Sequence, residues 1–184
     1  IRPTIQEALN IRKTTGRIRS YLKNDMKIER GLGAIGCYLS HFNVLKKYQN
    51  IDDEYLCILE DDVQFDERTI KEVNNILDFF KKENIEWDML RSVWNFKNIR
   101  DLKLLDNKIY KFDTKNAQSN NILGCLSLNT FSGGTHFQVI NVKNINRILS
   151  YLKKEKIFNI DSIYSTNELN VYAVLDDTLN VKLH

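Results

Sequence analysis

Three adjacent carboxylates, Glu60, Asp61 and Asp62, directly follow the apolar run Tyr55–Leu59. Carboxylates this close repel one another, and burying them unpaired would cost a great deal of free energy. Their oxygen atoms are the ligands that Mg²⁺ and Mn²⁺ prefer, often together with substrate phosphates. The triplet therefore predicts a divalent-metal or phosphate site. Taken alone, it is equally consistent with a solvated turn.

The elements that flank the triplet decide where it lies. Tyr55–Leu59 is a short continuous apolar run, which predicts a strand buried on both faces, as in a parallel sheet. We expect a helix over 31–50 before it and another over 66–83 after it, the second capped by Asp66. Ligands of open α/β sheets collect at the carboxyl ends of the strands, so the triplet is expected at the ligand-binding edge.

The rest of the chain continues the alternation of strands and helices. We expect a charged helical segment over 4–26, a strand over 87–96, a hairpin over 99–113, a polar loop over 114–130, a strand over 136–140, a helix over 143–154 and a strand over 171–175. This order predicts one α/β domain over 1–184, with a Rossmann-like, mainly parallel sheet flanked by helices.

Composition narrows the class of protein. The 184 residues are 42% hydrophobic and 28% charged, as expected of a folded domain. The net charge of +3 is dispersed along the chain, which argues against nucleic acid as a partner. Three widely spaced cysteines, Cys37, Cys57 and Cys125, lie among apolar residues. They predict reduced core thiols and fit neither a disulfide framework nor a zinc site.

The chain has no apolar run of the roughly 20 residues that a membrane-spanning helix needs, and no signal-peptide pattern at Ile1. We therefore expect a cytoplasmic protein without a transmembrane segment, with at most peripheral contact with a membrane.

Two blocks of sequence resemble glycosyltransferase family 25. The first is Gly36-Cys37-Tyr38-Leu39-Ser40-His41, and the second, one helix later, is Ile58-Leu59-Glu60-Asp61-Asp62. Further on, Gly134-Thr135 before a strand and Ile160-Asp161 before the last strand are similar to later elements of that family. The family includes lipopolysaccharide-biosynthesis enzymes, collagen galactosyltransferases and relatives encoded by large DNA viruses. The cytoplasm expected above is accordingly that of a bacterium or of a virus-infected host cell.

The resemblance implies a GT-A-like fold and an inverting hexosyltransferase. The donor would be a UDP-sugar, with galactose or glucose transferred to a glycan, glycolipid or glycoprotein, and the cofactor would be Mn²⁺ or Mg²⁺. Two features depart from the family. The usual first strand is not recognisable, and Ala34 stands where many members have Glu.

The resemblance also assigns roles to individual residues. Asp62 is expected to bind the metal directly, Glu60 is the next candidate ligand, and Asp61 would face the ribose or orient its neighbours. The turn at Gly134 and Thr135 would bring backbone amides close to the donor or acceptor, or it is simply a tight turn.

An inverting transfer needs a general base for the acceptor hydroxyl. Asp161 is the first candidate and Asp88 the reserve, although Asp161 is equally explained as a helix N-cap. His41 is expected to be a packed structural residue. His136 is as consistent with a satisfied core histidine as with a substrate or metal contact.

Two other functions compete with sugar transfer. A degenerate relative would bind a sugar nucleotide or glycan without catalysis, as the missing first strand and Ala34 suggest. A different metal-dependent phosphate enzyme could use the same acidic strand end.

Overall fold

A computed structural model describes residues 28–93, 95–96, 102–106, 109–112, 131–132, 135–155, 160–164 and 168–183. The segments expected as a helix over 4–26 and as a loop over 114–130 lie outside the described residues, as does Gly134.

In the described part of the chain, the central sheet has six strands in the order β1-β8-β3-β9-β6-β5. Its members are β1 (Tyr55–Leu59), β3 (Met89–Val93), β5 (Leu102–Asp106), β6 (Ile109–Phe112), β8 (Phe137–Asn141) and β9 (Val171–Leu175). Only the β3–β9 pair among these is parallel, and the other four pairings are antiparallel. The α/β class is confirmed, whereas the expectation of a mainly parallel sheet is wrong.

Strand β8 explains most of this difference. It lies between β1 and β3 and runs antiparallel to both. Among the described residues, the chain passes through β4, the β5–β6 hairpin and β7 before it reaches β8. Antiparallel neighbours need no helical crossover, so the alternation of strands and helices in the sequence did not fix the direction of β8.

Strand β1 is also more exposed than expected. It lies at one end of the strand order, and only Ile58 of its five residues is buried. Tyr55, Cys57 and Leu59 are exposed at alternate positions, so one face of the strand reaches solvent. The expectation of burial on both faces is wrong, because β1 is paired with β8 alone among the described strands.

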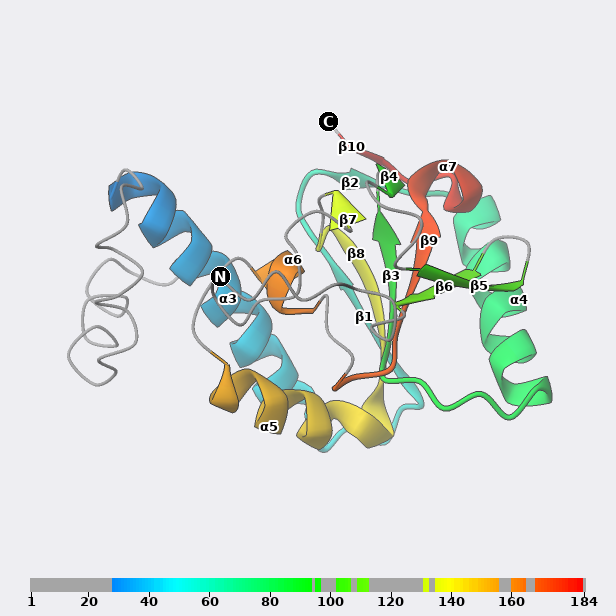
Figure 1. Cartoon of the computed structure of the whole chain (residues 1–184), viewed down its shortest axis with the longest axis horizontal. Helices are drawn as coiled ribbons and strands as arrows, with labels where there is room; N and C mark the ends of the chain where they lie inside the picture. Colours follow the sequence, from blue (N-terminus) through cyan, green and yellow to red (C-terminus); the bar gives the residue numbers. More distant parts are fainter. Residues whose placement is uncertain are drawn as a thin grey trace.

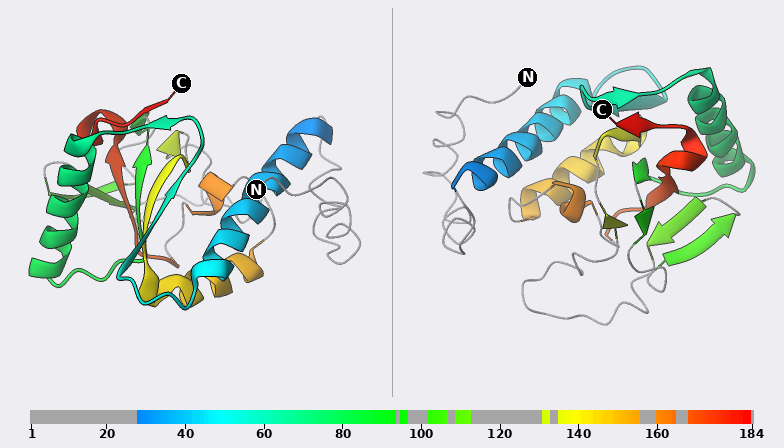
Figure 2. Two further views of the ribbon diagram at one scale, coloured as in Figure 1. Left: turned by 180° about the vertical axis from the view of Figure 1, so that it is seen from behind. Right: turned by 90° about the horizontal axis from the view of Figure 1, so that it is seen from above.

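Helices cover both faces of the sheet (Figures 1 and 2). One face carries α3 (Ile28–Tyr48), α5 (Ile145–Lys154) and the short α6 (Ile160–Ile163), and the other carries α4 (Glu67–Lys82) and α7 (Asp176–Leu179). The 3₁₀ turn η2 (Val142–Asn144) leads from β8 into α5. Two small sheets, β2 (Val63–Gln64) with β10 (Lys182–Leu183) and β4 (Asn95–Phe96) with β7 (Phe131–Ser132), complete the described part.

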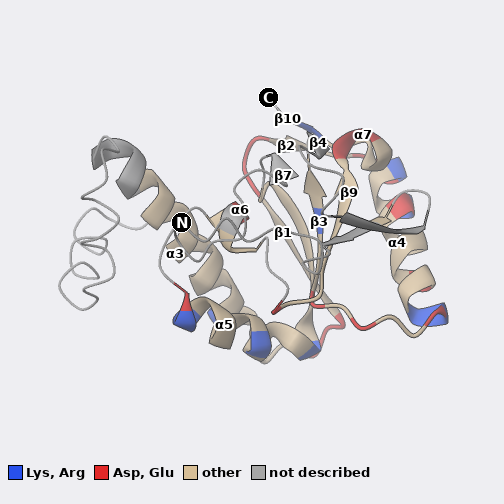
Figure 3. Ribbon diagram, in the orientation of Figure 1, with Lys and Arg blue, Asp and Glu red and all other residues tan. Residues whose placement is uncertain are grey.

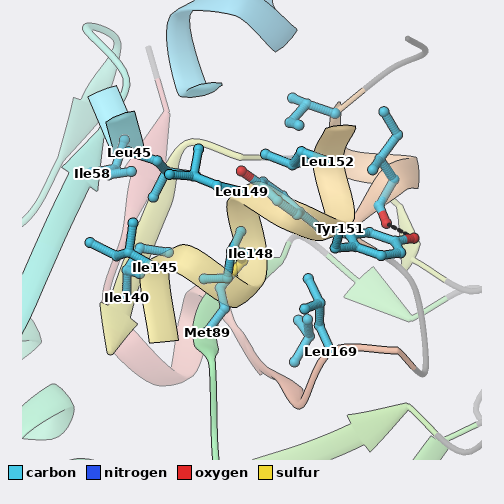
Figure 4. Packing of buried hydrophobic residues seen from close by; sticks show 14 of the residues in the cluster. Leu45, Ile58, Met89, Ile140, Ile145, Ile148, Leu149, Tyr151, Leu152 and Leu169 are labelled. Atoms are coloured by element: carbon cyan, nitrogen blue, oxygen red, sulfur yellow. Dashed lines mark hydrogen bonds between the residues drawn. The ribbon is translucent and has the colours of Figure 1, made fainter. Parts of the chain in front are cut away.

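Each face of the sheet has its own hydrophobic core. On the α3 side, Ile145, Ile148 and Leu149 of α5 pack with Leu45 of α3 and with strand residues such as Ile140 (Figure 4). On the other side, α4 contributes Val73, Ile76, Leu77 and Phe80. These residues follow the helical spacing of a buried stripe, which is why this helix was predictable from its sequence.

Helix α4 begins where the sequence predicts. The Asp66 carboxylate accepts the Thr69 amide at 3.1 Å, and the Thr69 hydroxyl accepts the Asp66 amide at 3.3 Å. This reciprocal capping box satisfies two otherwise unpaired donors and confirms Asp66 as the N-cap. None of the helices in the described ranges is both long and apolar enough to cross a bilayer.

Candidate functional site

The acidic triplet is divided between the end of a strand and a turn. The Glu60 amide donates to the His136 carbonyl at 2.9 Å, so the pairing of β1 with β8 continues one residue past Leu59. Asp61 and Asp62 lie in the following turn and are exposed, and acidic residues mark this stretch between β1 and β2 in Figure 3. Glu60 therefore has a fixed backbone, whereas its two neighbours face solvent.

The Glu60 side chain is held by residues from two other elements. Its Oε1 atom accepts the Thr135 hydroxyl at 2.5 Å and lies 3.7 Å from His41 Nε2 on α3. The His41 ring, and then the Thr135 hydroxyl, lower the pKa of Glu60, while partial burial works in the opposite direction. Glu60 is thus kept ionised at neutral pH.

Cys37 completes this group. It precedes His41 by four residues on α3, which places both side chains on the same face of the helix. One donor atom from each of Cys37, His41 and Glu60 lies within 4.8 Å of the other two. Burial, followed by the charge of Glu60, raises the pKa of Cys37 to about 11, so the thiol is protonated at neutral pH.

A buried arginine lies close to this cluster. Arg91 in the middle of β3 has no exposed surface, and its Nη1 donates to the Asp161 carbonyl at 3.0 Å. Burial lowers the pKa of Arg91, whereas the charges of Asp161 and Glu60 raise it. Asp161 lies three residues before Tyr164, whose ring centroid is 6.2 Å from that of His41, so this segment reaches the neighbourhood of Glu60. Asp161 lies within α6, which begins at Ile160, rather than before the helix as an N-cap would.

A second polar network lies at the ends of β9 and β3. Asp176, 8% exposed, contacts His136 Nε2 at 3.0 Å through Oδ1 and also accepts the Ser92 hydroxyl. The sequence contained a signal for this residue, because Asp176-Asp177 follows the apolar strand Val171–Leu175 just as Glu60 follows β1. Neither Asp176 nor Arg91 was a candidate in the sequence analysis. His136 is buried, and its Nε2 atom is paired with Asp176, as a core histidine would be.

Asp88 belongs to the opposite end of the sheet. Its carbonyl accepts the Asn141 amide, and Asn141 is the partner of Tyr55 at the start of β1. A five-residue strand, about 15 Å long, separates that end from Glu60. The structure therefore brings Asp161 and Thr135 to the neighbourhood of Glu60 and does not bring Asp88 there.

Comparison with known proteins identifies the family of the chain. The family described as glycosyltransferase family 25 (LPS biosynthesis protein) matches residues 6–164. This chain belongs to glycosyltransferase family 25. The matched range contains α3, the acidic triplet, Thr135 and Asp161, whereas Asp176 lies beyond it.

Two relatives carry the name procollagen galactosyltransferase 2. The chain is 29% identical to the human protein over 84 residues, which are 46% of this chain and 13% of that protein. It is 31% identical to the mouse protein over 58 residues, which are 32% of this chain and 9% of that protein. The similarity to these relatives is thus confined to a small part of their length.

Proposed function

We propose that this chain is a hexosyltransferase of family 25 that transfers galactose or glucose from a UDP-sugar to a hydroxyl of a glycan, glycolipid or glycoprotein. The observation that supports it best is the placement of Glu60, Asp61 and Asp62 at the carboxyl end of β1, within the matched range of the family. The strands β1, β3 and β9 all run towards this edge, where ligands of α/β sheets bind. A GT-A-like sheet and inversion at the anomeric carbon are part of this proposal.

The side chains of the acidic triplet are not equally suited to bind a divalent ion. Asp61 and Asp62 offer exposed carboxylates, as a hard cation shared with diphosphate requires. Both described contacts of the Glu60 side chain involve its Oε1 atom. We therefore propose that Asp62 binds the metal directly and that Glu60 is the next candidate ligand. Asp61 would lie closest to the nucleotide. The bound ion would offset the negative charge of the departing UDP.

Asp161 is the proposed general base. Its backbone carbonyl is fixed by Arg91, and its side chain is half-buried on the same face of the sheet as Glu60. A carboxylate in this position could accept the proton of an acceptor hydroxyl as that hydroxyl attacks the sugar. Thr135, by contrast, acts in this scheme by holding Glu60.

The decisive experiment measures binding of UDP and its dependence on metal. The melting temperature of the chain should rise with UDP plus Mn²⁺ but not with UDP alone. At 100 times the dissociation constant, the gain is about 2.7 kcal/mol. Asp62→Asn should abolish it. Asp177→Asn is the matched control, because it changes another exposed acid that follows a strand.

Turnover separates the alternatives. Release of UDP from UDP-galactose or UDP-glucose in the presence of Mn²⁺ supports transfer, and Asp161→Asn should reduce the rate without reducing UDP binding. Binding without turnover on any acceptor would favour a degenerate sugar-nucleotide binder. Release of phosphate without recognition of UDP would favour a different phosphate enzyme. Absence of any UDP or Mn²⁺ binding would refute the proposal.

A further inference from the structure

Cys37, His41 and Glu60 form a ligand set, here called the Cys–His–Glu cluster, of which Cys37 and His41 have no part in the proposed sugar transfer. Glu60 is only the second candidate for the metal of that reaction, so an ion held by this cluster leaves Asp62 as the ligand of the other metal. We propose that this cluster binds Zn²⁺, at a site separate from the Mn²⁺ or Mg²⁺ assigned to Asp62. The inference does not depend on the proposed transferase activity. It revises the expectation from sequence that the cysteines fit no zinc site.

The geometry supports a single ion. Zinc binds sulfur at about 2.3 Å and nitrogen or oxygen at about 2.0–2.2 Å, so the ligand atoms of a tetrahedral site lie about 3.3–3.6 Å apart. His41 Nε2 and Glu60 Oε1 are 3.7 Å apart, which is beyond hydrogen-bond distance but close to this spacing. No pair in the cluster exceeds 4.8 Å. Ligation therefore requires side-chain movements of about 1 Å.

His41 provides a second, independent observation. Its side chain is 5% exposed, and within the described part of the chain its Nδ1 atom has no hydrogen-bond partner. Its Nε2 atom faces Glu60 across a gap too long for a hydrogen bond. The unpaired Nδ1 atom shows that hydrogen bonds among the described residues do not hold this ring, although buried polar atoms are almost always paired. An ion between Nε2 and the carboxylate would fill the 3.7 Å gap and fix the ring through its other nitrogen.

The chemistry of the donors selects the metal. A thiolate and an imidazole are ligands typical of zinc, whereas Mg²⁺ and Mn²⁺ prefer oxygen. Three protein ligands leave a fourth position open to water or another molecule. Binding of Zn²⁺ would release the thiol proton of Cys37 to solvent, and the resulting thiolate and the Glu60 carboxylate together carry two negative charges that the ion would balance. Among nearby groups, Arg91 is cationic and Asp161 is acidic, so the surroundings add charges of both signs.

Thr135 acts as the outer support of this site. Its hydroxyl donates to Glu60 Oε1 at 2.5 Å. Burial raises the pKa of the Cys37 thiol, and Thr135 acts in the opposite direction. Partners of this kind orient a ligand, and their loss typically weakens metal affinity by about 10- to 100-fold. Thr135 is therefore a positioning residue for the metal rather than a ligand.

Cobalt substitution tests the proposal directly. Co²⁺ added to the reduced chain should give a thiolate-to-cobalt charge-transfer band in the near ultraviolet, saturating at one ion per chain. Cys37→Ser should eliminate the band, whereas Cys57→Ser, Cys125→Ser and Asp62→Asn should retain it. Thr135→Val should weaken Zn²⁺ affinity, measured by competition with a chelating dye, by about 10- to 100-fold. No band at saturating Co²⁺, or a band that persists in Cys37→Ser, would overturn the proposal.

A measurement on the unaltered chain guards against a variant that fails to fold. Zn²⁺ should slow the alkylation of Cys37 by at least about tenfold, because a metal-bound thiolate is a poor nucleophile, as read by peptide mass spectrometry. Alkylation of the exposed Cys57 should not change, and Mn²⁺ should protect neither. Equal alkylation of Cys37 with and without Zn²⁺ would refute the site. The UDP-binding test through Asp62 would be unaffected by that result.

Discussion

Asp88 and Glu60 are carboxylates at opposite ends of the same sheet, and their surroundings differ sharply. Asp88 has no exposed surface, and its Oδ2 atom accepts the Asn170 amide at 2.7 Å and Arg147 Nη1 at 3.1 Å. The Glu60 side chain is 35% exposed and is held only by Thr135 and the neighbouring His41 among its described contacts. A buried acid with a cation and an amide stabilises the fold. An accessible acid at a carboxyl end remains available to a ligand.

The strongest test of this difference is Asp88→Ala. It should lower the free energy of unfolding by about 3–5 kcal/mol, because it leaves the Asn170 amide and Arg147 without their buried acceptor. Urea unfolding monitored by circular dichroism measures the change. A loss below about 1 kcal/mol would mean that burial and pairing at Asp88 contribute little, and the contrast with Glu60 would disappear.

Asp176→Ala tests whether an acid at the carboxyl end of the sheet stabilises the fold when it is buried and paired. Asp176 lies at the same end of the sheet as Glu60 but is buried and paired with His136 and Ser92. We expect a loss of about 2 kcal/mol in the same unfolding assay, because two buried donors lose their acceptor. Asp177→Ala, on the exposed neighbour, should stay within about 0.5 kcal/mol. Equal effects of the two variants would contradict a structural role for this network.

Glu60→Gln should have a smaller effect on stability than either. The amide oxygen can still accept the Thr135 hydroxyl, and the side chain is partly exposed, so we expect a loss below about 1 kcal/mol. The same variant should weaken Zn²⁺ binding, because a neutral amide is a poor zinc ligand. A loss of stability as large as that of Asp88→Ala would show that Glu60, like Asp88, mainly stabilises the fold.

The smallest expected effect is on acid stability. The pKa of Glu60 lies below its ordinary value of 4.5 because His41 and Thr135 stabilise the carboxylate. The ionised form therefore stabilises the folded state above pH 4.5, and this contribution is lost as pH falls through the lower folded-state pKa. The unaltered chain should lose more stability than Glu60→Gln over that interval in metal-free urea titrations. Parallel pH profiles would show that the contacts of Glu60 do not favour its charge.

The elements that sequence predicted well are those specified locally. Strands β1 and β9 have the bounds expected from their apolar runs, and α4 begins at its Asp66 cap. The strand pairing was not predictable in this way, since the position of β8 between β1 and β3 depends on contacts between distant segments. The apolar run of β1 did not reveal that it would lie at the end of the strand order.

The same distinction between local and long-range contacts applies to the candidate site. The placement of Glu60 after β1 was predictable, because an apolar run ended abruptly in acids. Its proximity to His41, Cys37 and Thr135 was not, because those residues come from α3 and from the segment before β8. The exposed Cys57 likewise contradicts the prediction of a core thiol, since its position depends on which strands lie beside β1.

The hydrogen bond from the Glu60 amide to the His136 carbonyl also has a consequence on the timescale of amide exchange. This amide can exchange with solvent only when the end of the β1–β8 ladder opens, whereas Asp61 and Asp62 lie in an exposed turn. Deuterium should therefore enter at Asp61 and Asp62 before it enters at Glu60. The free energy of local opening would then differ between Glu60 and Asp61, although a single peptide bond joins these two residues.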